Sequence, residues 1–467
     1  MNRLLIVGDA LLDRDLDGAV SRLAPDAPVP VVEEPREWCR PGGAALAAAL
    51  AAGDGREVTL ITALGADDAG ATVRTLLERI GVNLVDVGND GPTPQKVRVR
   101  ASGQPVVRLD YGERRGTIAT PDPHALSAVR SARAVLVSDY GRGISAEPAM
   151  RDALEEGAED GAKLVWDPHP RGAAAVPGAR AITPNLAEAR HVTRAGDAAD
   201  DVRTVTRLAT DLRTQWQAHG VAVTLGSRGA LLVSGDGTPL MVPAPVLAQV
   251  TDPCGAGDRF AVTVAGSLAD GAVLSEAIVA AVASASEFVA AGGAGAVGAQ
   301  DAQDSDATRG LPEDHATAHD IIAAVHQRGG RVVATGGCFD LLHAGHVQLL
   351  ADARRLGDCL VVCINSDDSV RRLKGPGRPV VREADRSAVL LGLEAVDAVI
   401  AFDEDTPERV LSELRPDIWV KGADYAVTDL PEAPLIASWG GHAVVLPYLA
   451  GRSTTSMIRE AVRHARH

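Results

Sequence analysis

Short apolar runs alternate with longer alanine- and leucine-rich stretches through the first 300 residues of the chain. The first run, over 3–9, ends in glycine and aspartate. Further runs of strand length occupy residues 134–137, 164–166, 181–183 and 221–225. Strands that alternate with helices predict a largely parallel sheet covered by helices on both faces. The segment 94–111 instead alternates polar and apolar residues across a Ser-Gly turn, which predicts a hairpin that forms a small β flap beside the sheet.

The same alternation begins again after a polar, acidic stretch without periodicity at 298–319. Five further apolar runs, with helical stretches between them, occupy residues 331–337, 359–367, 395–402, 418–422 and 442–448. Together they have the size of a small nucleotide-binding α/β unit. We therefore predict a domain over 1–300, a linker with a connecting helix over 301–330, and a second domain over 331–467.

Charge and cysteine usage narrow the class of protein. The 467 residues carry a net charge of −16, which argues against nucleic acid as a partner because that partner requires clustered lysine and arginine. The five cysteines form no CxxC pair, the opening residues lack a signal-peptide layout, and no uncharged apolar run reaches membrane-spanning length. These features predict a cytoplasmic protein with no membrane partner.

The strongest local signal in the first domain is the turn Gly255-Ala256-Gly257-Asp258, which precedes a long helical pattern. Small residues at a helix N-terminus allow backbone N–H groups to converge on one point, where they stabilise a transferring phosphoryl group. Asp258 lies where it could take the proton from an attacking hydroxyl. The alternative is a structural turn that only begins a helix.

The most specific sequence motif of the second domain is Gly336-Gly337-Cys338-Phe339-Asp340, followed by His343 and His346. The glycines allow close approach to phosphates, and two histidines three apart share one face of the following helix. They can hold phosphate oxygens while negative charge builds during attack at phosphorus. A metal pair or surface histidines are the alternatives, but a zinc site would require a third ligand, and the sequence offers no second cluster with ligand spacing.

The first half contains a series of short motifs: Gly8-Asp9 with Asp13, Pro41-Gly42-Gly43, Asp139-Tyr140 with Gly143, Asn185-Leu186-Ala187-Glu188, and the turn at 255–258. In order and spacing, over about 290 residues, these motifs resemble those of the ribokinase-like sugar kinases. The resemblance implies that Asp258 is the catalytic base and that the amides of 255–257 form an anion hole. It further implies that Asn185, Leu186, Ala187 and Glu188 line the ATP site, with Asn185 and Glu188 orienting Mg²⁺ through water.

Three sequence segments in the same half, residues 12–14, 21–32 and 41–45, resemble the heptose 7-phosphate kinases. Sugar and sugar-phosphate contacts are therefore expected at Asp13, Arg14, Gly42, Gly43, Lys96, Arg98 and Arg108. The three basic residues of the flap have a second interpretation as a solvated hairpin face with alternating charge. Two positions depart from the family, which has Asn at Leu46 and usually Thr at Arg259. With Leu46 in place of Asn, a polar contact to the sugar is lost, or the leucine only repacks an alanine-rich helix. Arg259 could add a phosphate or nucleotide contact.

The second half resembles the cytidylyltransferase-like nucleotidyltransferases, and specifically the adenylyltransferase half of the bifunctional heptose enzymes, across nearly all of 331–467. The resemblance implies catalytic roles for His343, His346 and Lys374. It implies nucleotide contacts at Gly337, Cys338, Phe339, Asp340, Asn365, Asp367, Lys421, Gly422, Ser453, Thr454 and Thr455. Ser453 and Thr454 at a helix N-terminus are suited to phosphate binding.

These observations predict an α/β protein with a ribokinase-like three-layer domain, its β flap, and a smaller Rossmann-like nucleotidyltransferase domain. We expect a bifunctional, Mg²⁺-dependent enzyme that phosphorylates the anomeric hydroxyl of a heptose 7-phosphate with ATP and then makes ADP-heptose from ATP and heptose 1-phosphate. A separate phosphatase would act between the steps, and the family resemblance implies a homodimer or higher homo-oligomer. The alternatives are another sugar phosphate or nucleotide, or a degenerate kinase scaffold joined to an active transferase.

Overall fold

The computed structural model describes residues 3–24, 30–101, 104–196, 199–235, 237–245, 253–296, 318–423 and 430–447. The chain divides into two compact units, each of which is described by itself. The first comprises Met1–Ala199, Arg207–Ala230 and Ala244–Gln303, and the second comprises Asp200–Thr206, Leu231–Pro243 and Asp304–His467.

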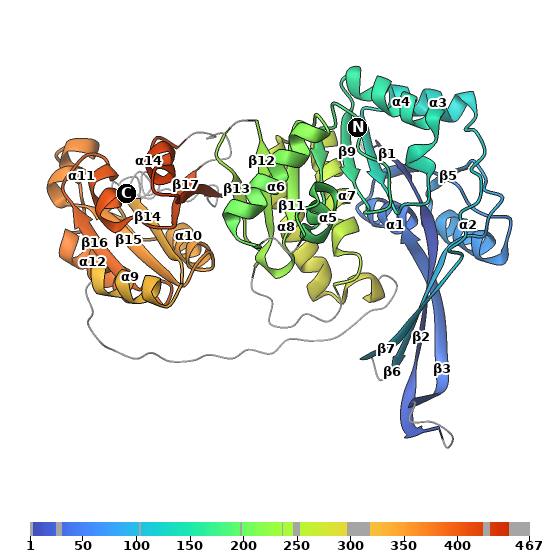
Figure 1. Cartoon of the computed structure of the whole chain (residues 1–467), viewed down its shortest axis with the longest axis horizontal. Helices are drawn as coiled ribbons and strands as arrows, with labels where there is room; N and C mark the ends of the chain where they lie inside the picture. The colour runs from blue at the N-terminus through green and yellow to red at the C-terminus, as the bar shows by residue number, and fades with distance from the viewer. Residues whose placement is uncertain are drawn as a thin grey trace, which may run out of the picture. The chain divides into compact units, whose positions relative to one another are not determined.

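A parallel sheet forms the centre of the first unit, with the strand order β5-β4-β1-β8-β9-β10-β11 (Figure 1). Its strands are β1 (Arg3–Gly8), β4 (Glu57–Thr62), β5 (Asn83–Asp86), β8 (Ala134–Ser138), β9 (Lys163–Asp167), β10 (Ala181–Ile182) and β11 (Gly220–Thr224). Along the chain, β12 (Ala230–Ser234) and β13 (Leu240–Val242) follow. The central strands are almost completely buried, as expected for strands covered on both faces. The predicted strands at 3–9, 134–137, 164–166, 181–183 and 221–225 are thereby confirmed.

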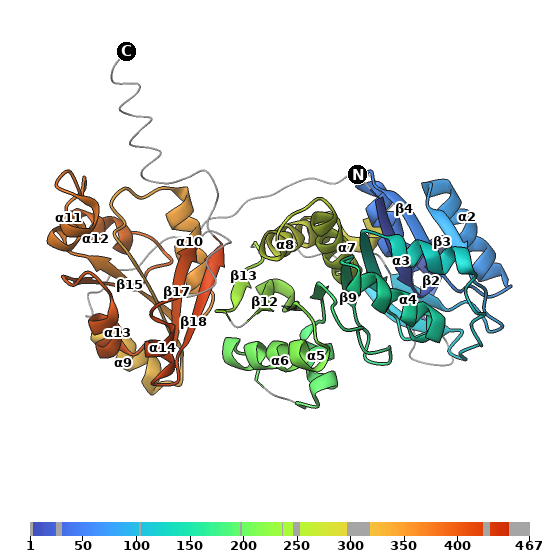
Figure 2. The same cartoon turned by 90° about the horizontal axis from the view of Figure 1, so that it is seen from above.

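Helices cover both faces of this sheet, and Figure 2 shows α7 and α8 on one side of the strands with α5 and α6 on the other. The helices are α1 (Ala44–Gly53), α2 (Asp68–Ile80), α3 (Pro123–Ser131), α4 (Pro148–Glu159), α5 (Leu186–Thr193), α6 (Val202–Gln215), α7 (Ala256–Ala269) and α8 (Leu274–Ala290). In α1 the residues from Ala44 to Ala51 are all buried, because small side chains let the helix pack closely against its neighbours. The three-layer arrangement that was predicted is present.

A second, four-stranded sheet has the order β3-β2-β6-β7 and extends from the first unit (Figure 1). It contains β2 (Ala10–Leu23), β3 (Pro30–Gly43), β6 (Gln95–Ala101) and β7 (Gln104–Tyr111). The strands β6 and β7 are the hairpin predicted over 94–111. The long strands β2 and β3 were not predicted, because their inward positions carry charged residues that form ion pairs, not the apolar alternation that signals a strand.

The second unit contains five parallel strands in the order β16-β15-β14-β17-β18. They are β14 (Val332–Gly337), β15 (Cys359–Asn365), β16 (Ala398–Phe402), β17 (Ile418–Ala423) and β18 (His442–Pro447). The helices are α9 (Ala318–Gln327), α10 (Ala344–Arg354), α11 (Asp367–Lys374), α12 (Glu383–Leu391), α13 (Glu408–Leu414) and α14 (Ala433–Ala437). In Figure 2, α10 and α12 lie on one side of these strands and α9 and α13 on the other. All five predicted strands are present.

The predicted connecting helix corresponds to α9, whereas 297–317, which hold most of the predicted linker, lie outside the described residues. None of the five cysteines, all of which the structure describes, forms a disulfide. Among the helices that the structure describes, none combines the length and apolar character needed to cross a bilayer.

Candidate active sites

The first candidate site lies at the carboxyl ends of the parallel strands of the first unit, where ligands of open α/β sheets bind. Asp9 follows β1, and its carboxylate accepts hydrogen bonds from the N–H groups of Tyr140 (3.0 Å), Arg142 (2.8 Å) and Ile144 (3.2 Å). Burial, together with the charge of Asp139, raises the pKa of Asp9 to about 6. Asp9 therefore fixes the loop after β8, which carries Tyr140 into the site.

The turn before α7 has the geometry expected of a glycine-rich helix start. Gly255 adopts a left-handed conformation with φ 81°, which a residue with a side chain rarely adopts, and α7 begins at Ala256. The N–H of Ala256 donates to the carbonyl of Pro253 at 3.1 Å, so this amide already has a partner in the protein itself. Gly257 lies in the first turn, where the N–H groups have no acceptor within the helix and point out of its N-terminal end.

Asp258 is buried in the first turn of α7, with 6% of its surface exposed. The hydroxyl of Tyr140 donates to both of its carboxylate oxygens, at 2.8 and 2.9 Å. Burial raises the pKa of Asp258 to about 7, opposed by the Tyr140 hydrogen bond and the positive charge of Lys96. A carboxylate with this pKa can accept a proton near neutral pH, as a general base must.

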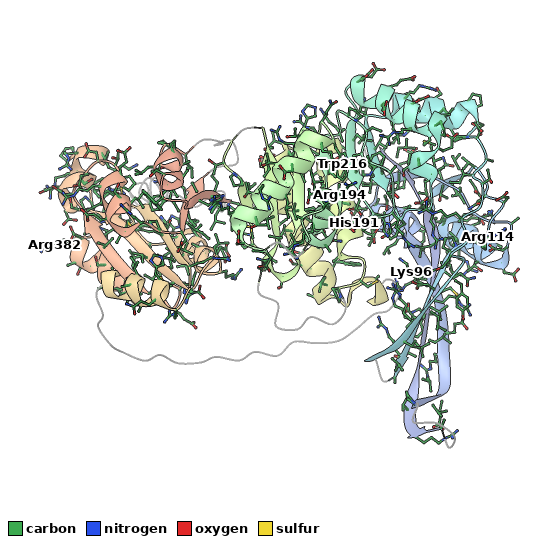
Figure 3. All side chains as sticks on the ribbon, viewed as in Figure 1. Lys96, Arg114, His191, Arg194, Trp216 and Arg382 are labelled. Carbon is green, nitrogen blue, oxygen red and sulfur yellow. The ribbon has the colours of Figure 1, made fainter. Side chains whose placement is uncertain are left out.

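Charged side chains of the four-stranded sheet meet on the face that carries Asp13. Asp13 forms ion pairs with Arg40 at 2.9 Å and Arg98 at 3.1 Å, and Arg40 also binds Asp15 at 2.7 Å. The Lys96 ammonium lies 5.0 Å from the centre of the Tyr140 ring. Figure 3 shows Lys96 where the four-stranded sheet joins the rest of the first unit. This face therefore brings two cations of the flap to the neighbourhood of Asp258.

The remaining predicted sugar-site residues divide between this face and other places. Arg98 donates to the Cys254 sulfur at 3.2 Å, which ties the flap to the turn before α7. Arg14 follows Asp13 in β2 and therefore points to the opposite face, where it binds Glu37. Arg108 lies opposite Arg98 in the hairpin, but it is exposed and pairs with Asp110 at 2.9 Å.

Gly42 and Gly43 let β3 approach β2 closely at the entrance to α1. A methyl group on Gly42 would lie 2.3 Å from Leu11 Cδ1 and 2.9 Å from the carboxyl carbon of Asp13. Gly43 has φ 58°, a left-handed conformation that favours glycine. These two glycines are thus needed for the backbone path beside Asp13.

Asn185 and Glu188 form a reciprocal capping box at the start of α5. The Asn185 side chain accepts from the N–H of Glu188 at 2.9 Å, and the Glu188 carboxylate accepts from the N–H of Asn185 at 2.8 Å. Leu186 and Ala187 form the first turn between them. Burial raises the pKa of Glu188. Desolvation and the charges of Asp258 and Glu188 raise the pKa of Asp167, at the end of β9, well above its usual value. Glu188 therefore belongs to the same acidic edge of the sheet as Asp258.

The two departures from the family pattern have clear positions. Leu46 is buried in α1, and a methyl group on Gly255 would meet its Cδ2 atom at 3.0 Å, so Leu46 packs against the turn before Asp258. Arg259 binds Ser284 at 2.6 Å and Asp54 at 2.8 Å. The guanidinium of Arg259 is thus already used to tie α7 to α8 and to the end of α1.

The second candidate site lies at the carboxyl end of β14. Phe339 adopts φ 45°, an uncommon conformation for a residue with a side chain, and the chain turns there into α10. His343 is the N-cap of α10, and its ring lies 4.0 Å from that of His346, centre to centre. Burial, reinforced by His343, lowers the pKa of His346 to about 4, so His346 is a neutral hydrogen-bonding group near pH 7. The two predicted histidines are therefore brought together.

A metal pair was the alternative for these histidines. Within the described part of the chain, no group of three or more His, Cys, Asp or Glu side chains is positioned to hold a metal ion. His346 packs against Phe339, with the two ring centres 5.2 Å apart.

Two aspartates predicted to contact nucleotide also hold the protein together. Asp340 is buried and accepts from the N–H groups of Val380 (2.6 Å) and Val381 (2.9 Å) and from Arg378. Asp367 accepts from the N–H of Glu383 at 2.9 Å. Their carboxylates thereby position the segment between α11 and α12.

The other predicted transferase residues occupy varied positions. Asn365 is buried at the end of β15, where its amide donates to Ser369 at 3.0 Å and accepts from the Cys338 thiol at 3.7 Å. Lys421 in β17 lies 3.5 Å from the buried Glu432, with Gly422 following it. Lys374 is exposed at the end of α11. Ser453, Thr454 and Thr455 lie outside the described residues, so their phosphate role stays a prediction.

Sequence reasoning missed Arg386, which is 1% exposed and connects three parts of the second site. It donates to the carbonyl of Cys338 at 2.6 Å, to Asp367 at 2.8 Å and to the carbonyl of Val381 at 3.1 Å. The one sequence signal for a buried role was that this arginine stands among the apolar residues of α12. Tyr140, Asp15 and Arg40 were likewise given no site role, because their partners are distant in sequence.

We expect Arg386→Met to loosen the second site, because the Cys338 carbonyl and Asp367 lose a buried donor, at a cost of about 1–3 kcal/mol. Hydrogen–deuterium exchange should then accelerate in peptides covering 336–341 and 378–383. Arg409→Met is the matched control, since Arg409 makes only exposed ion pairs. Unchanged exchange in the Arg386 variant would contradict the structural role assigned here.

The two sites define the class of protein: a carbohydrate kinase joined to a nucleotidyltransferase. Residues 1–301 match the model of the pfkB family of carbohydrate kinases, and residues 334–443 match the cytidylyltransferase-like model. The chain belongs to the family of bifunctional HldE proteins, whose members carry both domains, and it is a bifunctional enzyme with kinase and nucleotidyltransferase parts.

Relatives of this name match almost the whole chain. "Bifunctional protein HldE" of Streptomyces coelicolor is 56% identical over 99% of this chain and 97% of its own length. The protein of the same name from Shewanella sediminis is 37% identical over 98% of this chain and 96% of its own length.

Solved structures support the fold of the first unit. Ribokinase of Arabidopsis thaliana, solved with ribose and ATP, matches with a TM-score of 0.50 and 22% identity over 62% of this chain and 92% of that chain. The tetrameric inhibited form of phosphofructokinase-2 from Escherichia coli matches with a TM-score of 0.50 and 19% identity, over 62% of this chain and 94% of that chain. These likenesses confirm the predicted ribokinase-like fold.

Proposed function

We propose that the first domain transfers the γ-phosphate of ATP to the anomeric hydroxyl of a heptose 7-phosphate, and that the second makes ADP-heptose and pyrophosphate from ATP and heptose 1-phosphate. A separate phosphatase removes the 7-phosphate between the steps. The domains extend over 1–300 and 331–467, with the linker and connecting helix over 301–330. The relatives named HldE support this assignment.

The observation that carries the kinase proposal is the position of the flap cations beside the buried carboxylate of Asp258. Lys96 lies near enough to lower the pKa of Asp258, and Arg98 shares Asp13 with Arg40 on the same face. A sugar that already carries a phosphate requires a fixed cation for that phosphate and a base for its attacking hydroxyl. Lys96 and Arg98 would bind the 7-phosphate, Asp13 with the backbone at Gly42 and Gly43 would orient the sugar, and Asp258 would accept the proton. Arg14 and Arg108 would assist only after changing their present ion pairs.

ATP would lie along the edge formed by 185–188 and the start of α7. The amides of Gly255, Ala256 and Gly257 would face the transferring phosphate, with that of Ala256 leaving its Pro253 partner. Mg²⁺ fits here as an ion held through water: Asn185 and Glu188 already use oxygens in the capping box, and carboxylate oxygens retain further lone pairs. When bound, Mg²⁺ neutralises phosphate charge.

In the second domain His343 and His346 would donate hydrogen bonds to phosphate oxygens as the sugar phosphate attacks the α-phosphorus. Gly337, Cys338 and Phe339 would form the floor of the nucleotide site, with Asn365, Lys421 and Gly422 at neighbouring strand ends. Asp340 and Asp367 would act mainly by holding the segment around 378–383. Lys374 would reach pyrophosphate or sugar phosphate from its exposed position, and Ser453 to Thr455 complete the proposed set.

A homodimer through the flaps is the proposed assembly, and we place the enzyme in the cytoplasm. The edge strand β7 exposes Val107, Leu109 and Tyr111 at alternate positions, an apolar row that pairing of two flaps would cover. One alternative is that the same architecture acts on a different sugar phosphate. Leu46 supports this alternative, because an apolar side chain packs against the turn before Asp258 where the family has Asn.

The substrate proposal is tested with the full-length enzyme by ADP release, which reports the kinase alone because adenylyl transfer releases pyrophosphate. Heptose 7-phosphate should give the highest kcat/KM in a panel with fructose 6-phosphate, ribose and unphosphorylated heptose. A higher value for another sugar phosphate would favour the alternative substrate. No turnover with any sugar would support a degenerate kinase scaffold.

The kinase should also depend on pH through Asp258. Because the base must be ionised and its pKa is raised to about 7, kcat/KM should rise with pH through about 7 and level off above it. The profile is measured with saturating MgATP from pH 5.5 to 9. A flat profile across this range would contradict a base with a raised pKa.

A further inference from the structure

Tyr140 occupies a position next to the kinase base that its sequence motif alone does not explain. Its hydroxyl donates to both Oδ1 and Oδ2 of Asp258, at 2.8 and 2.9 Å, although the two residues are 118 positions apart in sequence. Bonds to both oxygens fix the rotation of the carboxyl group about its own axis. Each oxygen still retains a lone pair, so a substrate hydroxyl can approach while the phenol stays bound.

Three contacts hold the Tyr140 ring in place independently of Asp258. Its backbone N–H donates to Asp9 at 3.0 Å, and the Lys96 ammonium lies 5.0 Å from the ring centre. The ring of His169 stacks at 6.3 Å, at an angle of 26°. A phenol fixed by contacts from three different segments is suited to position the group that it binds.

We propose that Tyr140 is a positioning residue of the kinase reaction, whose hydroxyl holds the Asp258 carboxylate in one orientation and keeps it ionised until it takes the proton of the substrate hydroxyl. This inference rests on the proposed kinase function. In the step, the substrate O–H bond breaks and the proton goes to Asp258. The freed oxygen forms a bond to the γ-phosphorus, and the bond from that phosphorus to ADP breaks, with its electron pair leaving on ADP. Tyr140 keeps its own proton throughout.

The charges around Asp258 indicate what the loss of the hydroxyl would do. Burial and Asp13 favour the protonated form of Asp258, whereas Tyr140, Lys96 and a backbone hydrogen bond at Asp258 itself favour the ionised carboxylate. Burial and the neighbouring carboxylates raise the pKa of Tyr140 well above its usual value, so it remains a donor at every working pH. Without the hydroxyl, only Lys96 and the backbone hydrogen bond at Asp258 itself would oppose burial, and the pKa of Asp258 would rise.

The test is the pH profile of kcat/KM for full-length Tyr140→Phe, measured by ADP release with heptose 7-phosphate. Losing a hydrogen bond to a charged group should raise the apparent pKa of the acidic limb of the profile by about 1–2 units. Activity should therefore fall by about 10–100-fold on the acidic side and recover toward the wild-type plateau at high pH. Tyr111→Phe is the matched control, because Tyr111 is half exposed on β7. Adenylyl transfer by the same samples reports whether the chain is folded.

The outcomes separate this inference from the function on which it rests. If the wild type does not phosphorylate any sugar in the panel, the proposed function fails. If the wild type is active and Tyr140→Phe loses activity equally at all pH values, or loses none, the positioning role is refuted. Should Tyr140→Phe not fold, 3-fluorotyrosine at position 140 replaces it. This stronger donor should move the limb to lower pH, and an unmoved limb would overturn the proposal.

Discussion

Asp258→Asn is expected to reduce kinase turnover by about 10²–10⁴-fold, the usual contribution of a general base. The amide has nearly the shape of the carboxylate, but it cannot accept the proton of the substrate hydroxyl. Adenylyl transfer by the same protein should be unchanged, because the second site is built from residues of 336–386 and neighbouring strand ends. The measurement is ADP formation with heptose 7-phosphate beside pyrophosphate release with heptose 1-phosphate.

Asp270→Asn is the matched control for this variant. Asp270 caps the other end of α7 and pairs with Arg56 at the surface, so the same chemical change occurs on the same helix outside the site. It should leave both activities near wild type. Equal loss of both activities in Asp258→Asn would mean that the two sites are not independent.

His346→Ala should have the converse effect, lowering adenylyl transfer by about 10²–10³-fold while sparing the kinase. The estimate is that of removing one hydrogen-bond donor from a preorganised anion site. Because burial and His343 lower the pKa of His346 to about 4, the free enzyme presents a neutral imidazole at pH 7. Its contribution should therefore not decline between pH 6 and 8, as that of an imidazolium would.

The control for His346 is His326→Ala, which removes an exposed histidine of α9 that pairs with Asp417. Pyrophosphate release by both variants is compared at saturating MgATP, with ADP release by the kinase as the internal standard. Adenylyl transfer by His346→Ala at more than half the wild-type rate would remove the paired histidines from the mechanism.

Where an element depends on local pattern, the sequence predicted it. The buried parallel strands appear as apolar runs, and the short spacing of His343 and His346 brings their rings together at the start of α10. Gly255 could be recognised because a helix preceded by a glycine-rich turn needs a left-handed residue.

Contacts between distant segments could not be predicted in this way. The strands β2 and β3 escaped recognition because Asp13, Asp15 and Arg40 occupy inward positions that apolar residues usually fill. Arg14 was expected beside Asp13, although adjacent residues of a strand point to opposite faces. Likewise, the bond from Tyr140 to Asp258 and the links from Arg386 to Cys338 and Asp367 exist only because the fold brings separate motifs together.

If two separate sites act in succession on a heptose phosphate, mass analysis of the products will show both steps. The purified enzyme is incubated with MgATP and heptose 7-phosphate, with and without a phosphatase that removes the 7-phosphate. Heptose 1,7-bisphosphate is expected without the phosphatase and ADP-heptose with it. Formation of ADP-heptose without the phosphatase, or of neither product, would mean that the two sites do not act in this order.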